Sequence, residues 1–366
     1  MERNDLSGTG KIIAGKRKNP VHQMDLSELG GEFAFINRIA VKPRLKSVVV
    51  GIGDDAAVVR AGNRLLAITT DMLVERDHFS LEYFTPRQLG IKAMESNVSD
   101  IAAMGAKPLY AFISICLPKS ATVEFIDGFY AGVYESAGRH GADVLGGDTT
   151  HGDTIVVNIA LIGEIQNPKI RKTLQIPKNS KKMITSAASN SQIAKLLPLR
   201  SNAKEGDLIF VTGHLGASAA GLKLFLKKTE GFDFVKKKHL EPSARMDLSQ
   251  RIAKIANAME DVSDGLASEV RNICLASKKG AVIYAQNVPV AKETKAAASA
   301  CGNDALDYAL FGGEDFELVF TVPEKFKSKA QKLGTLVGKV TKGGGVFLEK
   351  NGVVAELKRF GYDHFA

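Results

Sequence analysis

The chain has 366 residues, of which 45% are hydrophobic and 24% charged, and its formal net charge is +9. These proportions exclude a disordered or fibrous chain and predict a soluble protein with room for two domains, each with its own core. Every apolar run ends well short of the roughly 18 residues that a membrane span needs. The first residues, MERNDLSGTGKIIAGKRKNP, lack the apolar centre of a secretory signal. The three cysteines form no CxxC pair, which favours a reducing cytoplasm and structural thiols.

The positive charge is concentrated in two segments. The first 24 residues carry five basic and two acidic side chains, and residues 166–199 carry seven basic side chains and no acidic one. Together they contribute +10, so the rest of the chain sums to −1. A solvated tail and loop explain this distribution better than a nucleic-acid arm, and we expect no nucleic-acid partner. We assign no fold to residues 166–199.

A P-loop-like motif lies in the basic tail. Residues Gly10 to Arg17, GKIIAGKR, match GxxxxGK but place Arg17 where a P-loop needs Ser or Thr for Mg²⁺. No strand precedes the motif, and the chain also lacks a GxGxxG fingerprint. If the protein binds ATP, we expect another architecture.

Alternating β-branched and helical runs predict an α/β first half. Apolar runs at 47–50 and 56–59 look like buried strands and enclose GIGDD, residues 51–55. This pentapeptide has two interpretations: a surface turn, for which Gly and Asp are the usual residues, or a ligand loop whose buried carboxylates need a cation. The further predicted strands are 65–71, 110–117, 143–148 and 154–165, the last of them fully buried.

Two helices are predicted between these strands. The first begins at Thr85 as N-cap, with Pro86 at the first helical position and Gln88 closing a capping box. Gly105 and Pro108 supply its stop. The second covers 123–138.

The second half continues the alternation. Strands are predicted within 206–213, 281–286, 311–322 and 333–340, and helices within 217–228, 242–259 and 266–276. The sequence DVSDG at 261–265 leads into the last of these helices.

Six short acidic motifs recur along the chain. Each pairs a carboxylate with Gly, Ser, Thr or Asn, and five stand at a predicted strand end or helix start: GDD (53–55), TTD (69–71), NVSD (97–100), GGD (146–148), DVSDG (261–265) and GGED (312–315). Mg²⁺ prefers a few carboxylates together with substrate phosphates. Small neighbours would admit a polyphosphate, and a helix start after Ser263 would add N–H donors. No EF-hand spacing is present.

Two candidate residues keep a second interpretation. Asp100 lies inside a predicted helix among apolar neighbours, so it is either an exposed residue or an inward ligand. His78 follows Asp71 by seven residues, which suits the same site, although a structural or surface histidine is the default. The cysteines have no neighbouring His or Asp motif, which argues against a thiolate nucleophile.

Taken together, these residues resemble the thiamine-monophosphate kinases, a family of the aminoimidazole ribonucleotide synthetase-like superfamily. The resemblance runs from Gly31 to Phe365 and rests on GIGDDAAVV, TTDMLVERDHF, NVSDIAAMGAKP, GGDTT, DVSDGLASE, GGEDFELVFTV and the terminal GYDHF. It implies an α/β (α+β) two-domain fold, with an N-terminal domain that forms a homodimer interface and a C-terminal α/β domain. The implied divisions are a basic extension (1–28), a metal- and ATP-binding domain (29–165), an inserted loop or linker (166–199) and the C-terminal domain (200–366).

The resemblance also implies the reaction and the site. ATP would phosphorylate thiamine monophosphate to thiamine diphosphate by direct in-line transfer with several Mg²⁺ ions, without a covalent nucleophile or dedicated base. The implied metal ligands are Asp54, Asp55, Thr69, Thr70, Asp71, Asp100, Asp148, Asp261 and Asp264, with Asp54 also open to solvent exposure. The implied ATP contacts are Tyr130, Gly147, Asp148, Arg200 and Ser263, and the implied substrate contacts are His78, Glu314 and Tyr362.

One departure and two alternatives remain. In the family the arginine element follows the first domain closely, whereas here RSNAKEGD (200–207) comes after the basic segment, which leaves the placement of Arg200 open. The alternatives are another activity of the superfamily, of the purine-precursor cyclo-ligase or selenophosphate synthase type, and a non-catalytic metal- or nucleotide-binding module.

Overall fold

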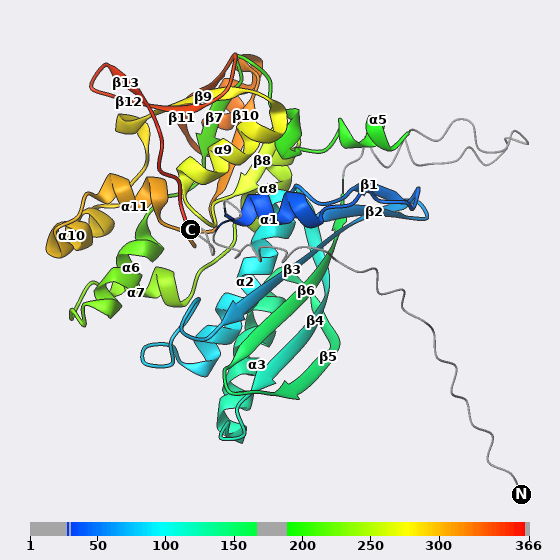
Figure 1. The fold of residues 1–366 in the computed structure, drawn as a ribbon, viewed down its shortest axis with the longest axis vertical. Coiled ribbons are helices and arrows are strands. Elements are labelled where there is room, and N and C mark those ends of the chain that lie inside the picture. The colour runs from blue at the N-terminus through cyan, green and yellow to red at the C-terminus, as the bar shows by residue number, and fades with distance from the viewer. Residues whose placement is uncertain (1–27, 29–30, 167–188, 363–366) are drawn as a thin grey trace, which may run out of the picture. The chain divides into compact units, whose positions relative to one another are not determined.

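The computed structural model describes Glu28, residues 31–166 and residues 189–362 (Figure 1). The P-loop-like motif and most of the basic insertion lie outside the described residues. The chain divides into two compact units, Met1–Ala40 with Asp363–Ala366, and Val41–Tyr362. The helix α1 (Glu32–Ile39) belongs to the first unit, and everything below concerns the second. No helix in the described ranges is long and apolar enough to cross a membrane.

The first half of the large unit forms a six-stranded sheet in the order β1-β2-β3-β6-β4-β5. Its strands pair antiparallel except for β4 and β5, which are parallel. Their bounds are β1 Val48–Val50, β2 Ala57–Ala61, β3 Arg64–Val74, β4 Ala106–Leu117, β5 Asp143–His151 and β6 Val156–Ile165.

Helices α2 (Pro86–Ala103) and α3 (Val123–His140) contact this sheet and each other (Figure 1). The predicted capping box of α2 is confirmed, because the Thr85 hydroxyl accepts from the Gln88 N–H and the Gln88 side chain accepts from the Thr85 N–H. The buried side of the sheet and the helices share one apolar core that includes Val98, Phe129 and Ile159. Residues 189–199 also join it through Ile193, on α5 (Asn190–Ala194).

Strand register assigns side chains to two faces of the sheet. Thr70 and Phe112 both pair with Ala160, so their side chains lie on one face, and Thr69 and Asp71 lie on the other. The face with Thr69 belongs to the core, whereas Met72 and Phe112 on the opposite face are 55% and 41% exposed. We call the face with Thr70 and Phe112 the outer face.

The second half forms a seven-stranded sheet in the order β13-β12-β9-β11-β7-β10-β8. It is antiparallel except for β12 and β9. The strands are β7 Leu208–Val211, β8 Ala258–Asp261, β9 Gly280–Tyr284, β10 Leu318–Val322, β11 Thr335–Thr341, β12 Val346–Lys350 and β13 Val353–Glu356. The helices are α6 Ala217–Leu226, α7 Asp233–Leu240, α8 Met246–Ala253, α9 Leu266–Ser277, α10 Lys292–Cys301, α11 Ala305–Phe311 and α12 Lys327–Ala330.

Three details differ from the sequence-based expectations. The helix expected over 242–259 covers only α8, because Ala258–Asp261 pairs with β10 as strand β8. Pro108 lies inside β4 rather than ending α2, which already stops at Ala103. Strand β6 alternates buried and half-buried residues, so it is not fully buried.

Candidate active site

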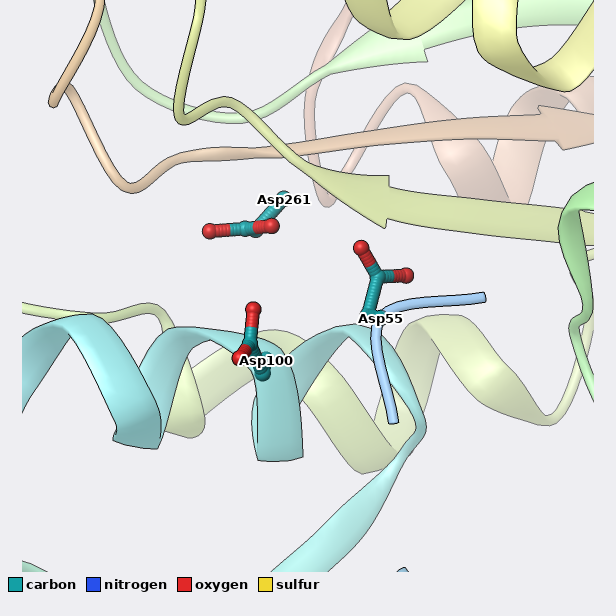
Figure 2. A group of neighbouring side chains, drawn as sticks. All are labelled: Asp55, Asp100 and Asp261. Atoms are coloured by element: carbon teal, nitrogen blue, oxygen red, sulfur yellow. The ribbon is translucent and has the colours of Figure 1, made fainter. Parts of the chain in front are cut away.

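Three carboxylates from distant parts of the chain meet at one point. Asp55 precedes β2, Asp100 lies on α2 and Asp261 ends β8, and one oxygen of each lies within 4.8 Å of the others (Figure 2). Asp55 belongs to GIGDD, and φ of Gly53 is +119°, a backbone conformation that favours glycine. The loop therefore bends the chain and also brings the Asp55 carboxylate to the cluster.

The side chain of Asp100 points inward, which decides between its two interpretations. Residues Leu89 to Ser99 of α2 are all buried, so the helix has almost no solvent-facing side there. The Thr69 hydroxyl donates to Asp100 Oδ2 over 2.5 Å. Likewise, the Ser99 hydroxyl donates to Asp261 Oδ2 over 2.6 Å. These bonds hold both carboxylates in place.

Burial makes this concentration of negative charge costly. It raises the pKa of Asp100 and Asp261 well above the usual range, and nearby carboxylates, among them Asp55 and Asp71, raise it further. Burial likewise raises the pKa of Asp71 to about 6 and, with Asp55 as second cause, that of Asp54 to about 7. The site therefore favours either protons or a cation.

Arg200 partly neutralises the cluster. Its guanidinium lies 2.6 Å from Asp55 Oδ1 and 2.9 Å from Glu260 Oε1. Two buried carboxylate oxygens, Asp55 Oδ2 and Glu260 Oε2, still have no hydrogen-bond partner among the described residues. An orphaned, buried oxygen in an all-oxygen donor set fits a hard divalent cation such as Mg²⁺. Asp55, Asp100 and Asp261 are the residues that would hold it.

Four of the other residues expected to bind metal lie on strands of the first sheet and fall into two groups. Thr69 and Asp71 lie on the inner face of β3, and the charges of Asp71 and Asp100 act on each other. Thr70 points to the outer face, where its hydroxyl donates to Asn158 Oδ1 over 2.9 Å. Asp148 pairs with Ser114, which places it on that same face. The structure does not bring the side chains of Thr70 and Asp148 to the three-carboxylate cluster.

Two N–H groups that immediately precede the start of α9 are already used. The N–H groups of Ser263 and Asp264 both donate to Glu269 Oε1, over 3.2 and 2.7 Å. They are not free for a phosphate in this conformation, and the carboxylate of Asp264 lies outside the three-carboxylate cluster.

Two further expected ATP contacts lie on the first-half elements. Tyr130 is half-buried on α3 between the rings of Phe129 and Tyr134. A Cβ at Gly147 would lie 1.6 Å from the carbonyl oxygen of Ile113, so the close pairing of β5 with β4 already requires glycine there.

The three residues expected to bind substrate are joined by two intermediaries. Lys92 Nζ lies 2.5 Å from Glu314 Oε1 and donates to the His78 carbonyl over 2.8 Å. The Tyr362 hydroxyl donates to Asp77 Oδ1 over 2.8 Å, next to His78. The structure therefore brings His78, Glu314 and Tyr362 into one polar network.

This network continues to the acidic cluster. The Glu314 N–H donates to the Ser263 carbonyl over 2.7 Å, two residues after Asp261. Burial alone would raise the pKa of Glu314, but Lys92 and a hydrogen bond to His239 lower it to about 2. Glu314 is thus an ionised carboxylate at ordinary pH.

Sequence reasoning missed Lys92, His239 and Glu260. None belongs to a motif, and their partners are remote in sequence. One signal was available for Lys92, since it stands among Leu89, Ile91, Ala93 and Met94 in a helix without a polar face. A lysine in that setting needs a buried partner.

Two family models match this chain, one for each of the two sheets. Residues 53–165 match the family model "AIR synthase related protein, N-terminal domain", and residues 204–351 match its C-terminal counterpart. The thiamine-monophosphate kinase of Aquifex aeolicus is 34% identical over 346 residues, which covers 93% of this chain and 100% of that protein. The Bacillus subtilis thiamine-monophosphate kinase is 35% identical over 356 residues, which covers 91% and 99%.

Solved structures agree with these relatives. AaThiL complexed with AMPPCP and TMP superposes with a TM-score of 0.78 at 33% identity, covering 94% of this chain and 99% of that one. The hydrogenase maturation protein HypE in complex with ATP reaches a TM-score of 0.60 at 19% identity, covering 81% and 86%, which shows a shared fold alone.

Proposed function

The chain belongs to the thiamine-monophosphate kinases of the AIR synthase related family and phosphorylates thiamine monophosphate with ATP, and we propose that it does so by direct in-line transfer with several Mg²⁺ ions. The observation that supports the metal-assisted route is the cluster of Asp55, Asp100 and Asp261 with its orphaned oxygen. A degenerate binding module would have no need for such a costly arrangement, and the named relatives favour the kinase over the other superfamily activities.

The chemistry asks for positioning more than for a base. The acceptor is a phosphate oxygen that is already anionic near neutral pH, so no side chain has to remove its proton. The two phosphorylated substrates repel each other, and carboxylates alone would add to that repulsion. Mg²⁺, when bound, would supply the compensating charge. The role of the protein is to hold the oxygen atoms that would bind Mg²⁺ in fixed positions and shielded from water.

We assign the binding roles as the family resemblance implies them. His78, Glu314 and Tyr362 contact thiamine monophosphate, and their shared polar network supports that grouping. The ATP contacts are Tyr130, Gly147, Asp148, Arg200 and Ser263. For Arg200 this requires an exchange of partners, because its guanidinium is engaged by Asp55 and Glu260 in the structure.

We also propose that two copies of the chain associate through the outer face. On this face β3 and β4 present Met72, Tyr110 and Phe112, all more than one third exposed. Exposed apolar side chains gathered on one face are typical of an interaction site. A homodimer would cover it and would also enclose Thr70 and Asp148. Since the reaction consumes ATP, we place the enzyme in the cytoplasm.

Stereochemistry at the transferred phosphorus tests the in-line route. ATP made chiral at the γ-phosphorus with oxygen isotopes would give thiamine diphosphate of inverted configuration after a single direct transfer. Retention would require two successive transfers, and hence a phosphoenzyme, and would contradict the proposal. Omission of MgCl₂ from the same reaction should abolish product.

A further inference from the structure

We propose that Lys92 is a positioning residue for thiamine monophosphate, whose buried ammonium fixes the Glu314 carboxylate and the His78 segment in the substrate site. His239 contacts the same carboxylate from another side and helps to hold it in place. The inference rests on the proposed function, since His78 and Glu314 contact substrate only in that account.

Burial of the Lys92 ammonium costs free energy, which a functional role would explain. Its side chain is 0% exposed on α2, and a buried ammonium is tolerated only when paired and hydrogen-bonded. Its Nζ meets Glu314 Oε1 at 2.5 Å and the His78 carbonyl at 2.8 Å, and it lies 5.2 Å from the ring centroid of Phe84. One atom thus joins the loop between β3 and α2 to a segment of the second half.

His239 approaches the same carboxylate from α7. Its Nδ1 lies 3.4 Å from Glu314 Oε2 and 3.0 Å from the Ser218 hydroxyl. The ring is 2% exposed, and its Nε2 has no hydrogen-bond partner in the part of the chain that the structure describes. Tyr83 lies against the His239 ring and is itself stacked on Phe225, with ring centroids 4.6 Å apart.

The Glu314 side chain itself is 27% exposed. Lys92 and His239 are both buried, so they hold the Glu314 carboxylate from the interior of the protein. The exposed part of the Glu314 side chain is left for a ligand. The backbone supports the same conclusion, because φ of Glu314 is +67°, a left-handed conformation that is costly for a residue with a Cβ. Backbone strain of this kind persists at positions where function requires one orientation of the side chain. An ionised, aimed carboxylate suits the cationic thiazolium or the amino group of the substrate.

The test is the replacement Lys92→Met, which keeps an unbranched side chain one atom shorter and removes its charge. We expect KM for thiamine monophosphate to rise about tenfold or more, a loss of roughly one well-made ionic contact. KM for ATP should stay within about twofold of the wild type. A residue that only stabilises the fold would lower the active fraction, and with it kcat, without this split.

Lys236→Met is the matched control. Lys236 also donates to a backbone carbonyl, that of Thr229 at 2.6 Å, and also lies over a ring, that of Phe225 at 5.4 Å, but no ion pair joins it to Glu314. Its KM values should remain those of the wild type. An equal effect of both replacements would overturn the inference.

The double variant Lys92→Met/Glu314→Gln covers the case in which Lys92→Met does not fold. It leaves no buried charge unpaired at this place, so it should recover the thermal stability of the wild type. Its KM for thiamine monophosphate should be close to that of Glu314→Gln alone, because Lys92 acts largely through this carboxylate, and a KM about tenfold above that of the single variant would overturn the inference. Failure of the proposed function looks different, because the wild type itself would then form no thiamine diphosphate.

Discussion

The guanidinium of Arg200 lies 2.6 Å from Asp55 Oδ1, while the other oxygen of the same carboxylate has no hydrogen-bond partner within residues 31–166 and 189–362. One oxygen of Asp55 is therefore paired with Arg200, and the other is available to a bound cation. The arrangement links stability to activity, since the arginine that the family resemblance assigns to ATP also balances the charge of the acidic cluster. Both roles can be measured separately.

Replacement Arg200→Met should destabilise the metal-free protein by about 3–5 kcal/mol, because it leaves Asp55 and Glu260 buried without a counter-charge. Thermal unfolding in EDTA measures the loss, and saturating MgCl₂ should restore part of it. The control is Arg64→Met, which breaks an ion pair with Glu164 at a side chain that is 57% exposed. That change should cost no more than about 1 kcal/mol. Equal melting temperatures for the two variants would contradict the assignment.

Replacement Asp100→Asn should separate stability from catalysis. The amide keeps an oxygen for the Thr69 hydroxyl but removes a charge that burial, Asp71 and Asp261 all disfavour. We expect the melting temperature in EDTA to rise and turnover to fall by about two orders of magnitude or more. Asp127→Asn, at an exposed position on α3, is the control and should change neither. Near-normal turnover of Asp100→Asn would remove Asp100 from the metal set.

The acidic cluster also predicts a pH dependence of stability. The pKa of Asp71 is about 6 and that of Asp54 about 7 in the folded chain, against an ordinary 3.8. The folded state therefore binds more protons than the unfolded state across this interval. This contribution to stability is complete below pH 3.8 and is lost as the pH rises through about 6 to 7.

Urea unfolding of EDTA-treated protein between about pH 8 and pH 5 measures this contribution. The free energy of unfolding should rise as the pH falls, and the rise should be smaller in Asp71→Asn. Mg²⁺ competes with these protons, so its stabilising effect should grow with pH. Identical slopes for the wild type and Asp71→Asn would show that Asp71 does not titrate in this range.

The outer face predicts the oligomeric state. Phe112 is 41% exposed on that face, and Phe112→Asp should convert a dimer into a monomer in sedimentation velocity experiments at micromolar concentration. Val123→Asp is the control, because Val123 is exposed at the start of α3 and away from the outer face. A monomeric wild type, or a Phe112→Asp dimer, would contradict association through this face.

Much of this molecule could be predicted from local patterns. The capping residues Thr85 and Gln88 located the start of α2, and the Gly- and Asp-containing motifs located Asp55 before a strand and Asp261 shortly before a helix. Local patterns failed where long-range pairing decides. Ala258–Asp261 is a strand because β10 lies beside it, not because of its own propensity.

The same limit applies to the candidate site. A helix that is buried on nearly every side has no polar face, so periodicity could not tell which way Asp100 points. Register within the sheet, unknown from the sequence, sends Thr70 and Asp148 to the face opposite Thr69 and Asp71. The clamp of Lys92 and His239 on Glu314 joins three segments far apart in the chain and could be seen only in the folded structure.

The most direct measurement incubates the purified protein with ATP, MgCl₂ and thiamine monophosphate and separates the products by chromatography. The account predicts thiamine diphosphate and ADP in equal amounts, with no product when Asp261→Asn replaces the wild type. Folded wild-type protein that forms no thiamine diphosphate, or that hydrolyses ATP without phosphorylating the acceptor, would contradict it.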